Sequence, residues 1–530
     1  MDLLSMRLSF GIQNPAELQR LLKEQQDRRS PDYHRWLTPE EFGRRFGLPE
    51  QEFQSARRWL EQNGLVITSA YPNRLSIYFS GTAAQVERAF NVGIGIYELE
   101  GKRFYSNDRS PQLPEQFRDT ALGVFGLDNF PSEKPLFKVG SRISMAPSDL
   151  QRAYNLLPLL NRGIDGTGQA IAVVARSDFD LNDVRAFRST FGLAPNDPEK
   201  IYVVPGQNPD MSDPNEVTEV LLDTEWAGAF APAASIKVVI APTSTSITPS
   251  LDYVVNQLSS VPVVNVSFGG GESVVPDSTL VEYDQRYMQA ASQGQSVFVA
   301  SGDDGAQQFA TVSQLSTGPD VNRLCSSPHV TCVGGTNLNP VFDSEANVTQ
   351  FGEETAWSGS GGGRSRFYQK PDYQFGPGVP ADGMRDVPDV AAMGSPNQQG
   401  VFWYQGGTLQ CCLGGTSLST PLWAGLFALV NQAITNAEPG SSGVGLANNR
   451  IYEMARSQLT LGGPQSFHDV TTGSNSTETM AGYTADVAYD LVTGWGSFDG
   501  DVFVRNFTSK SRTTGSRRWL LGSEYLLRSP

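Results

Sequence analysis

The sequence predicts an α/β protein with two domains: an N-terminal α+β domain and a larger domain built on a parallel β-sheet. Strand-like and helical segments alternate up to about residue 130, and residues 131–147 then carry prolines and no strong periodicity. Beyond them, short apolar runs alternate with helical stretches, an order that requires crossover connections between parallel strands. The 530 residues are enough for both domains.

The N-terminal domain is predicted to be an open antiparallel sheet combined with helices. Asn14 is a candidate helix N-cap, and Thr38, Pro39 and Glu41 follow the pattern of a capping box. We expect strands at residues 3–10, 65–68, 75–79 and 93–98, and helices at 15–24, from 39 onward, at 51–63 and at 82–90.

The larger domain is predicted from buried strands with helices between them. We expect strands at 171–175, 235–240, 261–267 and 296–301, and helices at 180–191, 217–230, 250–258 and 283–294. Catalytic and ligand-binding groups gather at the carboxyl ends of the strands in such sheets, and the candidate site residues are therefore sought there.

Charge is divided unevenly along the chain. There are 40 basic and 56 acidic residues, but residues 1–130 hold 16 and 17 of them, so nearly all of the net charge of −16 lies in the larger part. An acidic surface disfavours nucleic acid and anionic membranes as partners. No apolar stretch reaches the ~18 residues of a membrane helix, and the residues after Met1 lack the apolar block of a signal peptide. The acidic surplus suits a protein that works in acid.

Cysteine and histidine are both scarce. The four cysteines form two close pairs, so one or two disulfides are possible, and small buried residues are an equal alternative. No cysteine or histidine spacing resembles a zinc site. The residues concerned are Cys325, Cys332, Cys411, Cys412, His34, His329 and His468.

Two carboxylates lie four residues apart in the predicted helix at 217–230. Glu219 and Asp223 therefore share one helix face. A solvated acidic face is the ordinary interpretation of such a pair. The apolar residues between them, and the continuation to Trp226, favour partial burial instead.

Two turns place polar side chains next to predicted elements. Asp303 follows the strand at 296–301, where an ordinary β-turn would also explain it. A glycine-rich turn delivers Ser417 to the start of an apolar helix, where a serine can be an N-cap or an exposed nucleophile.

Together these segments resemble the sedolisin family of serine-carboxyl peptidases, over nearly the whole chain. Residues 30–42 (SPDYHRWLTPEEF) are similar to the kumamolisin-type activation propeptide. Four further blocks match in order and spacing: SGDDGA from residue 301, SPHVTCVGGT from 327, VPDVA from 387 and GTSLSTP from 415. The resemblance implies a subtilisin-like parallel-sheet catalytic domain at 148–508, after a ferredoxin-like antiparallel propeptide domain at 1–130 and a linker with a processing site at 131–147. A tail at 509–530 has no assigned role.

The resemblance also implies a role for each candidate residue. Ser417 is expected to be the nucleophile, Glu219 its general base, Asp223 the group that orients Glu219, and Asp303 the oxyanion-hole residue. A carboxylate base works best near its own pKa, and Asp303 can donate a hydrogen bond only while protonated, so we expect activity in acid. Asp304 stands where the family commonly has serine, and its charge is expected to raise the pKa of Asp303.

A histidine-based mechanism, as in the subtilisins, is disfavoured by the sequence. The helix that carries Glu219 has no histidine, and Asp178 is displaced from the end of the first strand of the larger domain. The glycine-rich loop at 267–273 is expected to border the substrate.

A calcium ion is a further expectation from the resemblance. Asp469 and Asp490 would give carboxylates, and Val470, Asp486 and Ala488 backbone carbonyls, which are ligand types that Ca²⁺ prefers. The family usually has glycine at the positions of Asp486 and Ala488, and an ordinary acidic turn is the alternative.

The sequence as a whole indicates an acid-acting serine-type peptidase made as a self-processing zymogen. Its expected partners are protein or peptide substrates and its own propeptide, which acts as inhibitor and folding chaperone. The protein is expected to be a monomer that is secreted or held in another acidic compartment. Endopeptidase and tripeptidyl-peptidase action both stay open. A catalytically silent, peptide-binding or calcium-stabilised relative is the alternative from another class.

Overall fold

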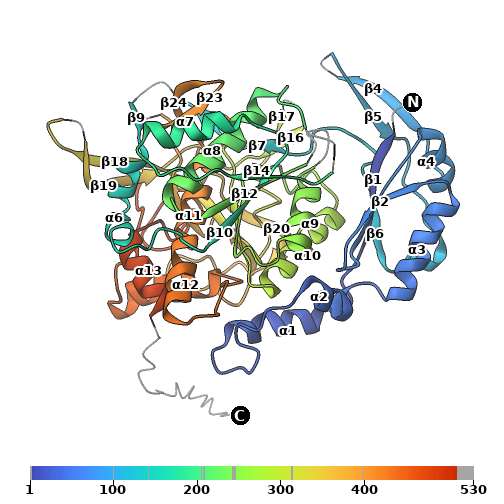
Figure 1. The fold of residues 1–530 in the computed structure, drawn as a ribbon, viewed down its shortest axis with the longest axis horizontal. Helices are drawn as coiled ribbons and strands as arrows, with labels where there is room; N and C mark the ends of the chain where they lie inside the picture. The colour runs from blue at the N-terminus through green and yellow to red at the C-terminus, as the bar shows by residue number, and fades with distance from the viewer. Residues whose placement is uncertain are drawn as a thin grey trace, which may run out of the picture.

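A computed structural model describes residues 3–99, 101–140, 143–204, 206, 209–241, 246–311, 314–345, 347–397 and 399–509. The N-terminal domain, blue to cyan in Figure 1, lies beside a larger domain coloured green to red. Helices α1 (Pro15–Gln26) and α10 (Asp277–Ser292) pack together across the interface. Within the described ranges, none of the helices is long and apolar enough to cross a bilayer.

The N-terminal domain is built on a four-stranded sheet in the order β2-β3-β1-β6. Its strands are antiparallel, and β1 lies inside the sheet because it pairs with β3 on one side and β6 on the other. Helices α3 and α4 bury Phe53, Leu60, Val86 and Phe90 in one apolar core with the strands. The elements are β1 Leu4–Phe10, α2 Pro39–Phe46, α3 Glu50–Gln62, β2 Val66–Ala70, β3 Ser76–Gly81, α4 Ala83–Phe90 and β6 Ala121–Phe125.

This domain confirms the predicted antiparallel α+β fold, with three differences. The strand expected at 93–98 forms a separate hairpin, β4 (Ile94–Leu99) with β5 (Lys102–Asn107), and β6 was not predicted. Thr38 and Glu41 form the predicted capping box. Asn14 occupies the N-cap of α1 in a left-handed conformation, but its side chain makes no capping hydrogen bond.

The larger domain confirms the predicted parallel sheet. Its strand order is β11-β12-β10-β13-β15-β18-β19, with β22 also paired to β18; all these pairs are parallel except β18 with β19. The strands are β10 Ala170–Ala175, β11 Glu199–Tyr202, β12 Ser235–Ile240, β13 Val263–Val266, β15 Ser296–Ala300, β18 Thr331–Phe342, β19 Val348–Ala356 and β22 Val390–Met393.

Helices cover both faces of this sheet, and the sequences of its central strands are therefore continuous apolar runs. Val173 of β10 packs in the core with α8 (Pro214–Phe230) and α11 (Thr416–Ala437), whereas Val174 packs in the core with α9 (Thr248–Gln257) and α10. Helix α10 begins six residues before the predicted start, and strands β11, β18 and β19 were not predicted.

The expected linker at 131–147 is held against the larger domain over much of its length. It contains three short strands, β7 (Lys134–Pro135), β8 (Lys138–Val139) and β9 (Ile143–Met145), and each pairs with a strand of the larger domain.

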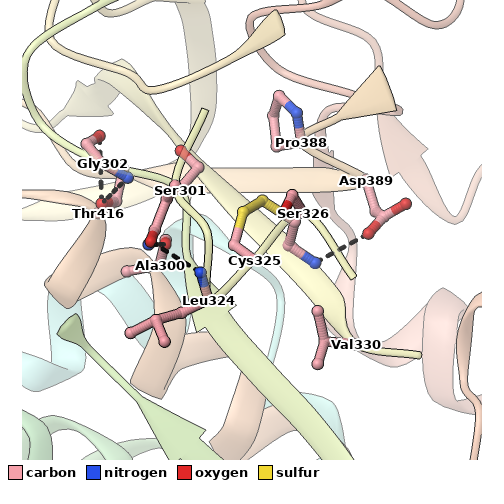
Figure 2. The surroundings of a disulfide bond; sticks show 12 residues. Ala300, Ser301, Gly302, Leu324, Cys325, Ser326, Val330, Pro388, Asp389 and Thr416 are labelled. Atoms are coloured by element: carbon pink, nitrogen blue, oxygen red, sulfur yellow. Dashed lines mark hydrogen bonds between the residues drawn. A yellow bond between two sulfur atoms is a disulfide. The ribbon is translucent and has the colours of Figure 1, made fainter. Parts of the chain in front are cut away.

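One of the two possible disulfides is present. Cys325 and Cys332 are bridged, and Figure 2 shows the bridge near Ala300–Gly302, the turn that precedes Asp303. Cys411 and Cys412 are thiols whose sulfur atoms lie 2.7 Å apart.

Candidate active site

The two carboxylates of helix α8 are buried, and the solvated-face interpretation is therefore wrong. The exposed fractions of Glu219 and Asp223 are 1% and 0%, because α8 packs against the sheet and against the neighbouring helix α11. The spacing of four residues puts both side chains on one face of the helix, as predicted.

Burial changes the proton affinity of this pair. It raises the pKa of Glu219 well above its usual value, and the like charge of Asp223 raises it further. Burial also raises the pKa of Asp223 to about 8, although Ser267 Oγ donates a hydrogen bond to its Oδ1 at 2.7 Å. Two buried carboxylates on one helix face titrate as a pair, so the pair holds a proton over the range in which an exposed carboxyl is ionised.

Ser417 lies at the turn that joins strand β24 (Thr408–Gly414) to helix α11. Gly415 makes this turn with φ of +110°, and a Cβ there would lie 2.5 Å from the carbonyl oxygen of Leu136. The N-cap residue is Gly415, so Ser417 does not cap the helix. Its hydroxyl instead donates a hydrogen bond to Ser267 O at 3.3 Å. The same hydroxyl lies near Glu219 and lowers the pKa of that carboxyl against the effect of burial.

Asp303 follows strand β15 and faces the start of α11. Its Oδ1 accepts hydrogen bonds from Thr416 N at 2.7 Å and Thr416 Oγ1 at 2.9 Å, while Oδ2 has no partner among the described residues. Thr416 is also hydrogen-bonded to Gly302, which fixes the two turns against each other (Figure 2). Burial raises the pKa of Asp303 to about 7, and the charge of Asp304 adds to this, as predicted.

Asp304 behaves differently from its neighbour. Burial alone would raise its pKa, but two ammonium groups outweigh burial and lower it. These are Lys134 Nζ at 2.7 Å and Lys138 Nζ at 3.0 Å, both from the segment between the domains.

That segment runs past Ser417 in an extended conformation. On one side β7 pairs antiparallel with β14 (Phe268–Gly269), and on the other β8 pairs antiparallel with β24. Leu136 lies between them, and its N–H donates to Ser267 O at 3.3 Å and to Glu219 Oε2 at 2.9 Å. Its carbonyl oxygen accepts a hydrogen bond from Ser417 N at 3.0 Å. The Leu136 carbonyl is therefore the peptide group presented to Ser417.

The side chain of Leu136 is buried beside the glycine-rich loop at 267–273. A Cβ on Gly269 would lie 2.7 Å from Leu136 Cδ1 and 2.8 Å from Asn322 Nδ2, so the glycine leaves room for the leucine. The sequence predicted this loop near the substrate and a processing site within 131–147, but it did not predict that residues 133–139 pair with the larger domain, nor the contacts of Asn322 and Thr416. The only sequence signal for the segment is a proline-containing stretch between two domains.

No described contact joins a histidine to Ser417. His329 pairs with Asp284 at 2.7 Å, and the His468 ring stacks on Phe351. Asp178 binds Lys200 and the Tyr202 hydroxyl. The residues expected for a histidine-based mechanism are thus engaged elsewhere.

The expected calcium ligands form one loop cluster. Asp469 Oδ2 accepts a hydrogen bond from Ala488 N at 2.9 Å, and Asp490 accepts from Val492 N and Thr493 N at 2.8 and 2.9 Å. Ala488 has φ of +73°, a conformation typical of glycine. No group of three or more acidic, histidine or cysteine side chains within the described residues has metal-binding geometry. The expected ligand set combines two carboxylates with three backbone carbonyls, which are donor types that fit a calcium ion. Its two carboxylates are too few to define a metal site by side chains alone.

Comparison with known proteins agrees with this architecture. The model for the pro-kumamolisin activation domain matches residues 2–130, and the model for the subtilase family matches residues 222–457. Sedolisin from Pseudomonas sp. (strain 101) is 30% identical over 93% of this chain and 85% of its own. Kumamolisin from Bacillus sp. (strain MN-32) is 28% identical over 89% and 86%, and tripeptidyl-peptidase 1 from Canis lupus familiaris is 25% identical over 93% and 90%.

A solved structure shows the same relation. Pseudomonas sedolisin, described as a serine-carboxyl proteinase in complex with pseudo-iodotyrostatin, superposes with a TM-score of 0.57 at 28% identity, over 69% of this chain and 98% of its own. The fold, the activation domain and these relatives together show that the chain belongs to the sedolisin family of serine-carboxyl peptidases, which are serine-type peptidases made with a pro-domain.

Proposed function

We propose that this protein is an acid-acting endopeptidase that activates itself by cleaving its own Leu136–Phe137 bond. The observation that carries the proposal is the hydrogen bond from Ser417 N to the Leu136 carbonyl, in a segment paired with the larger domain on both sides of that residue. An extended segment held in this way lies as a substrate lies in a protease cleft.

The four buried side chains act one after another in the proposed reaction. The Ser417 hydroxyl attacks the Leu136 carbonyl carbon and gives its proton to Glu219, which Asp223 orients through their shared proton. The oxyanion is held by Ser417 N and by protonated Asp303. The bond to Phe137 N then breaks as Glu219 returns the proton to that nitrogen, and water hydrolyses the Leu136 ester on Ser417.

The acid range follows from Asp303. Its Oδ1 is occupied by two donors from Thr416, so the proton that serves the oxyanion is carried on Oδ2. Since the pKa of Asp303 is about 7, this proton is present in acid and lost at higher pH. The protein is proposed to act as a monomer in a secreted or otherwise acidic setting.

The domain boundaries are proposed as a propeptide at 1–130, a processing segment at 131–147 and a catalytic domain at 148–508. The tail expected at 509–530 lies, from residue 510 onward, outside the described residues. A buried ion pair joins propeptide and catalytic domain: Arg7 Nη2 lies 2.7 Å from Glu282 Oε2, and Ser9 also donates to Glu282.

This pair favours release of the propeptide in acid. Burial alone would raise the pKa of Glu282, but the guanidinium groups of Arg7 and Arg286 outweigh burial, so its pKa lies below the usual value. The pair therefore stabilises the interface above the ordinary pKa of a glutamate, and this stabilisation is lost as pH falls through the lowered pKa.

We further propose that one structural calcium ion binds at the Asp469 and Asp490 loops. The two carboxylates, together with the carbonyls of Val470, Asp486 and Ala488, are the proposed ligands, and the ion would tie the two loops together. The hydrogen bond from Ala488 N to Asp469 already places the loops side by side.

The proposal is tested by intact mass against time at about pH 4 and pH 7, for the full chain and its Ser417→Ala variant. We expect fragments 1–136 and 137–530 to form in acid and about twofold more slowly at pH 7, where about half of Asp303 is ionised, and none to form from the variant. Cutting of added casein by the processed protein, and not by the variant, completes the test. A protein that stays whole and cuts nothing would be a silent relative, and a first cut at another bond would refute the assignment of Leu136.

A further inference from the structure

The catalytic domain also encloses one carboxylate of the processing segment, four residues before the bond proposed to be cleaved. Glu133 is 2% exposed although Pro131 and Ser132 beside it are exposed. Its Oε2 accepts a hydrogen bond from Ile247 N at 3.0 Å, and its Oε1 accepts one from the Tyr283 hydroxyl. The Glu133 carboxylate is thus enclosed by donors of the catalytic domain.

Two buried arginines complete the enclosure. Arg176 Nη1 lies 3.9 Å from Glu133 Oε2, and Arg323 Nη2 lies 3.7 Å from Oε1. Arg323 also donates to the carbonyl of Ser132, so it contacts two consecutive residues of the bound segment. A Cβ on Gly270 would lie 2.3 Å from Arg323 Nη1, so the glycine-rich loop leaves room for this guanidinium.

The charges of this pocket balance only when a carboxylate is bound. Arg176 is neutralised by the catalytic domain itself, because Glu216 accepts hydrogen bonds from two of its guanidinium nitrogens. Arg323 is 1% exposed, and among the described residues Glu133 is the one acidic side chain within 4.0 Å of it. Once cleavage lets the propeptide leave, Arg323 loses this acidic neighbour, and a substrate carboxylate bound in its place would restore the charge balance.

We infer that Arg323, Tyr283, Arg176 and the Ile247 amide form a carboxylate-binding subsite, and that the mature enzyme prefers substrates with glutamate or aspartate four residues before the cleaved bond. The inference rests on the proposed function, since it needs the Leu136–Phe137 bond to mark the register. All four groups belong to the catalytic domain: Arg176 directly follows β10, Ile247 precedes α9, Tyr283 lies on α10, and Arg323 precedes the Cys325–Cys332 bridge.

The test compares two quenched peptides with the acid-processed enzyme. One carries residues 132–139 of this chain (SEKPLFKV), and the other has glutamine in place of the glutamate; the assay is run at about pH 5.5, above the ordinary pKa of glutamate. We expect kcat/KM to be about 10- to 100-fold higher for the glutamate peptide, as for loss of a buried, charge-assisted hydrogen bond. Equal rates for the two peptides would overturn the subsite.

Three variants test whether this pocket causes the preference for the glutamate peptide. Arg323→Met is expected to abolish the glutamate-over-glutamine ratio. Tyr283→Phe removes only the hydroxyl that reaches Glu133 and is expected to lower the ratio about fivefold, which covers the case in which the arginine variant does not fold. Tyr287→Phe is the matched control, because its hydroxyl, on the same helix, has no hydrogen-bond partner among the described residues, and it should keep the ratio.

The outcomes separate the two proposals. Wild-type enzyme that cuts casein and itself but treats both peptides alike refutes the subsite and leaves the peptidase assignment standing. A wild-type ratio retained in both Arg323→Met and Tyr283→Phe refutes the assignment to this pocket. Enzyme that cuts neither itself nor any substrate refutes both proposals.

Discussion

Replacing Asp303 by asparagine should remove the alkaline limit on activity that we assign to this carboxyl. Thr416 donates twice to Oδ1, so an asparagine keeps those contacts through its carbonyl oxygen and presents an N–H where the carboxyl presents its acid proton. The amide carries that hydrogen at every pH, whereas the carboxyl loses it near pH 7.

The size of the effect follows from the pKa. With a pKa of about 7, one tenth of Asp303 is protonated one unit above it, and a hundredth two units above it. One oxyanion donor is worth about 10²- to 10³-fold in kcat, so wild-type kcat should fall about tenfold by pH 8 and about a hundredfold by pH 9 relative to its acid plateau. The asparagine variant should not show this fall, while an alanine variant should lose about 10²- to 10³-fold even in acid.

The assay is the initial rate on a quenched peptide from about pH 3 to pH 9, with circular dichroism in the same buffers to separate chemistry from unfolding. Trace wild-type enzyme can process variants that mature slowly, and it is then removed by affinity tag. An asparagine variant with the same alkaline limb as wild type would refute the assignment of Asp303, because some other group would then govern that limb.

Three further predictions test other parts of the structure. Glu282→Gln mimics the protonated interface carboxyl, so the propeptide should be released at higher pH than in wild type; an unchanged midpoint in a pH series of size-exclusion runs would contradict this. Chelation by EDTA should lower the thermal midpoint, with added calcium restoring it, and Asp490→Asn should remove most of that response; a midpoint indifferent to calcium would contradict the proposed ion. The double variant Cys325→Ser and Cys332→Ser should lose about 2 kcal/mol of unfolding free energy, as expected for opening a short loop, and denaturant melts would show it.

The places of the candidate residues could be predicted because each is tied to a local element, whereas their roles followed from the resemblance to the sedolisin family. Helical spacing alone puts Glu219 and Asp223 on one face, and the rule that chemistry gathers at strand ends points to Asp303. Ser417 follows the glycine pair at 414–415, which predicts a turn directly before an apolar helix. In the structure Glu219 and Ser417 hydrogen-bond to Leu136, and Asp303 Oδ2 and the Leu136 carbonyl oxygen both lie against Gly415. Asp223 lies behind them, hydrogen-bonded to Ser267.

The parts of the site that could not be predicted depend on contacts between residues far apart in sequence. Strands β7 and β8 have two residues each, and they exist because β14 and β24 supply their hydrogen bonds. Neither periodicity nor propensity can reveal such strands. Glu133 and Arg323 look like ordinary charged residues until the fold places them 3.7 Å apart.

The pairing of strand β8 with β24 has a consequence for the kinetics of activation. With the proposed cut at Leu136–Phe137, the mature chain would begin at Phe137, next to Lys138 and Val139, which pair with β24 beside Ser417. The new terminus therefore occupies the leaving-group side of the cleft as a tethered reaction product. Bond cleavage and the onset of turnover are then two separate events, and a lag between fragment appearance and peptidase activity is built into the way the chain matures.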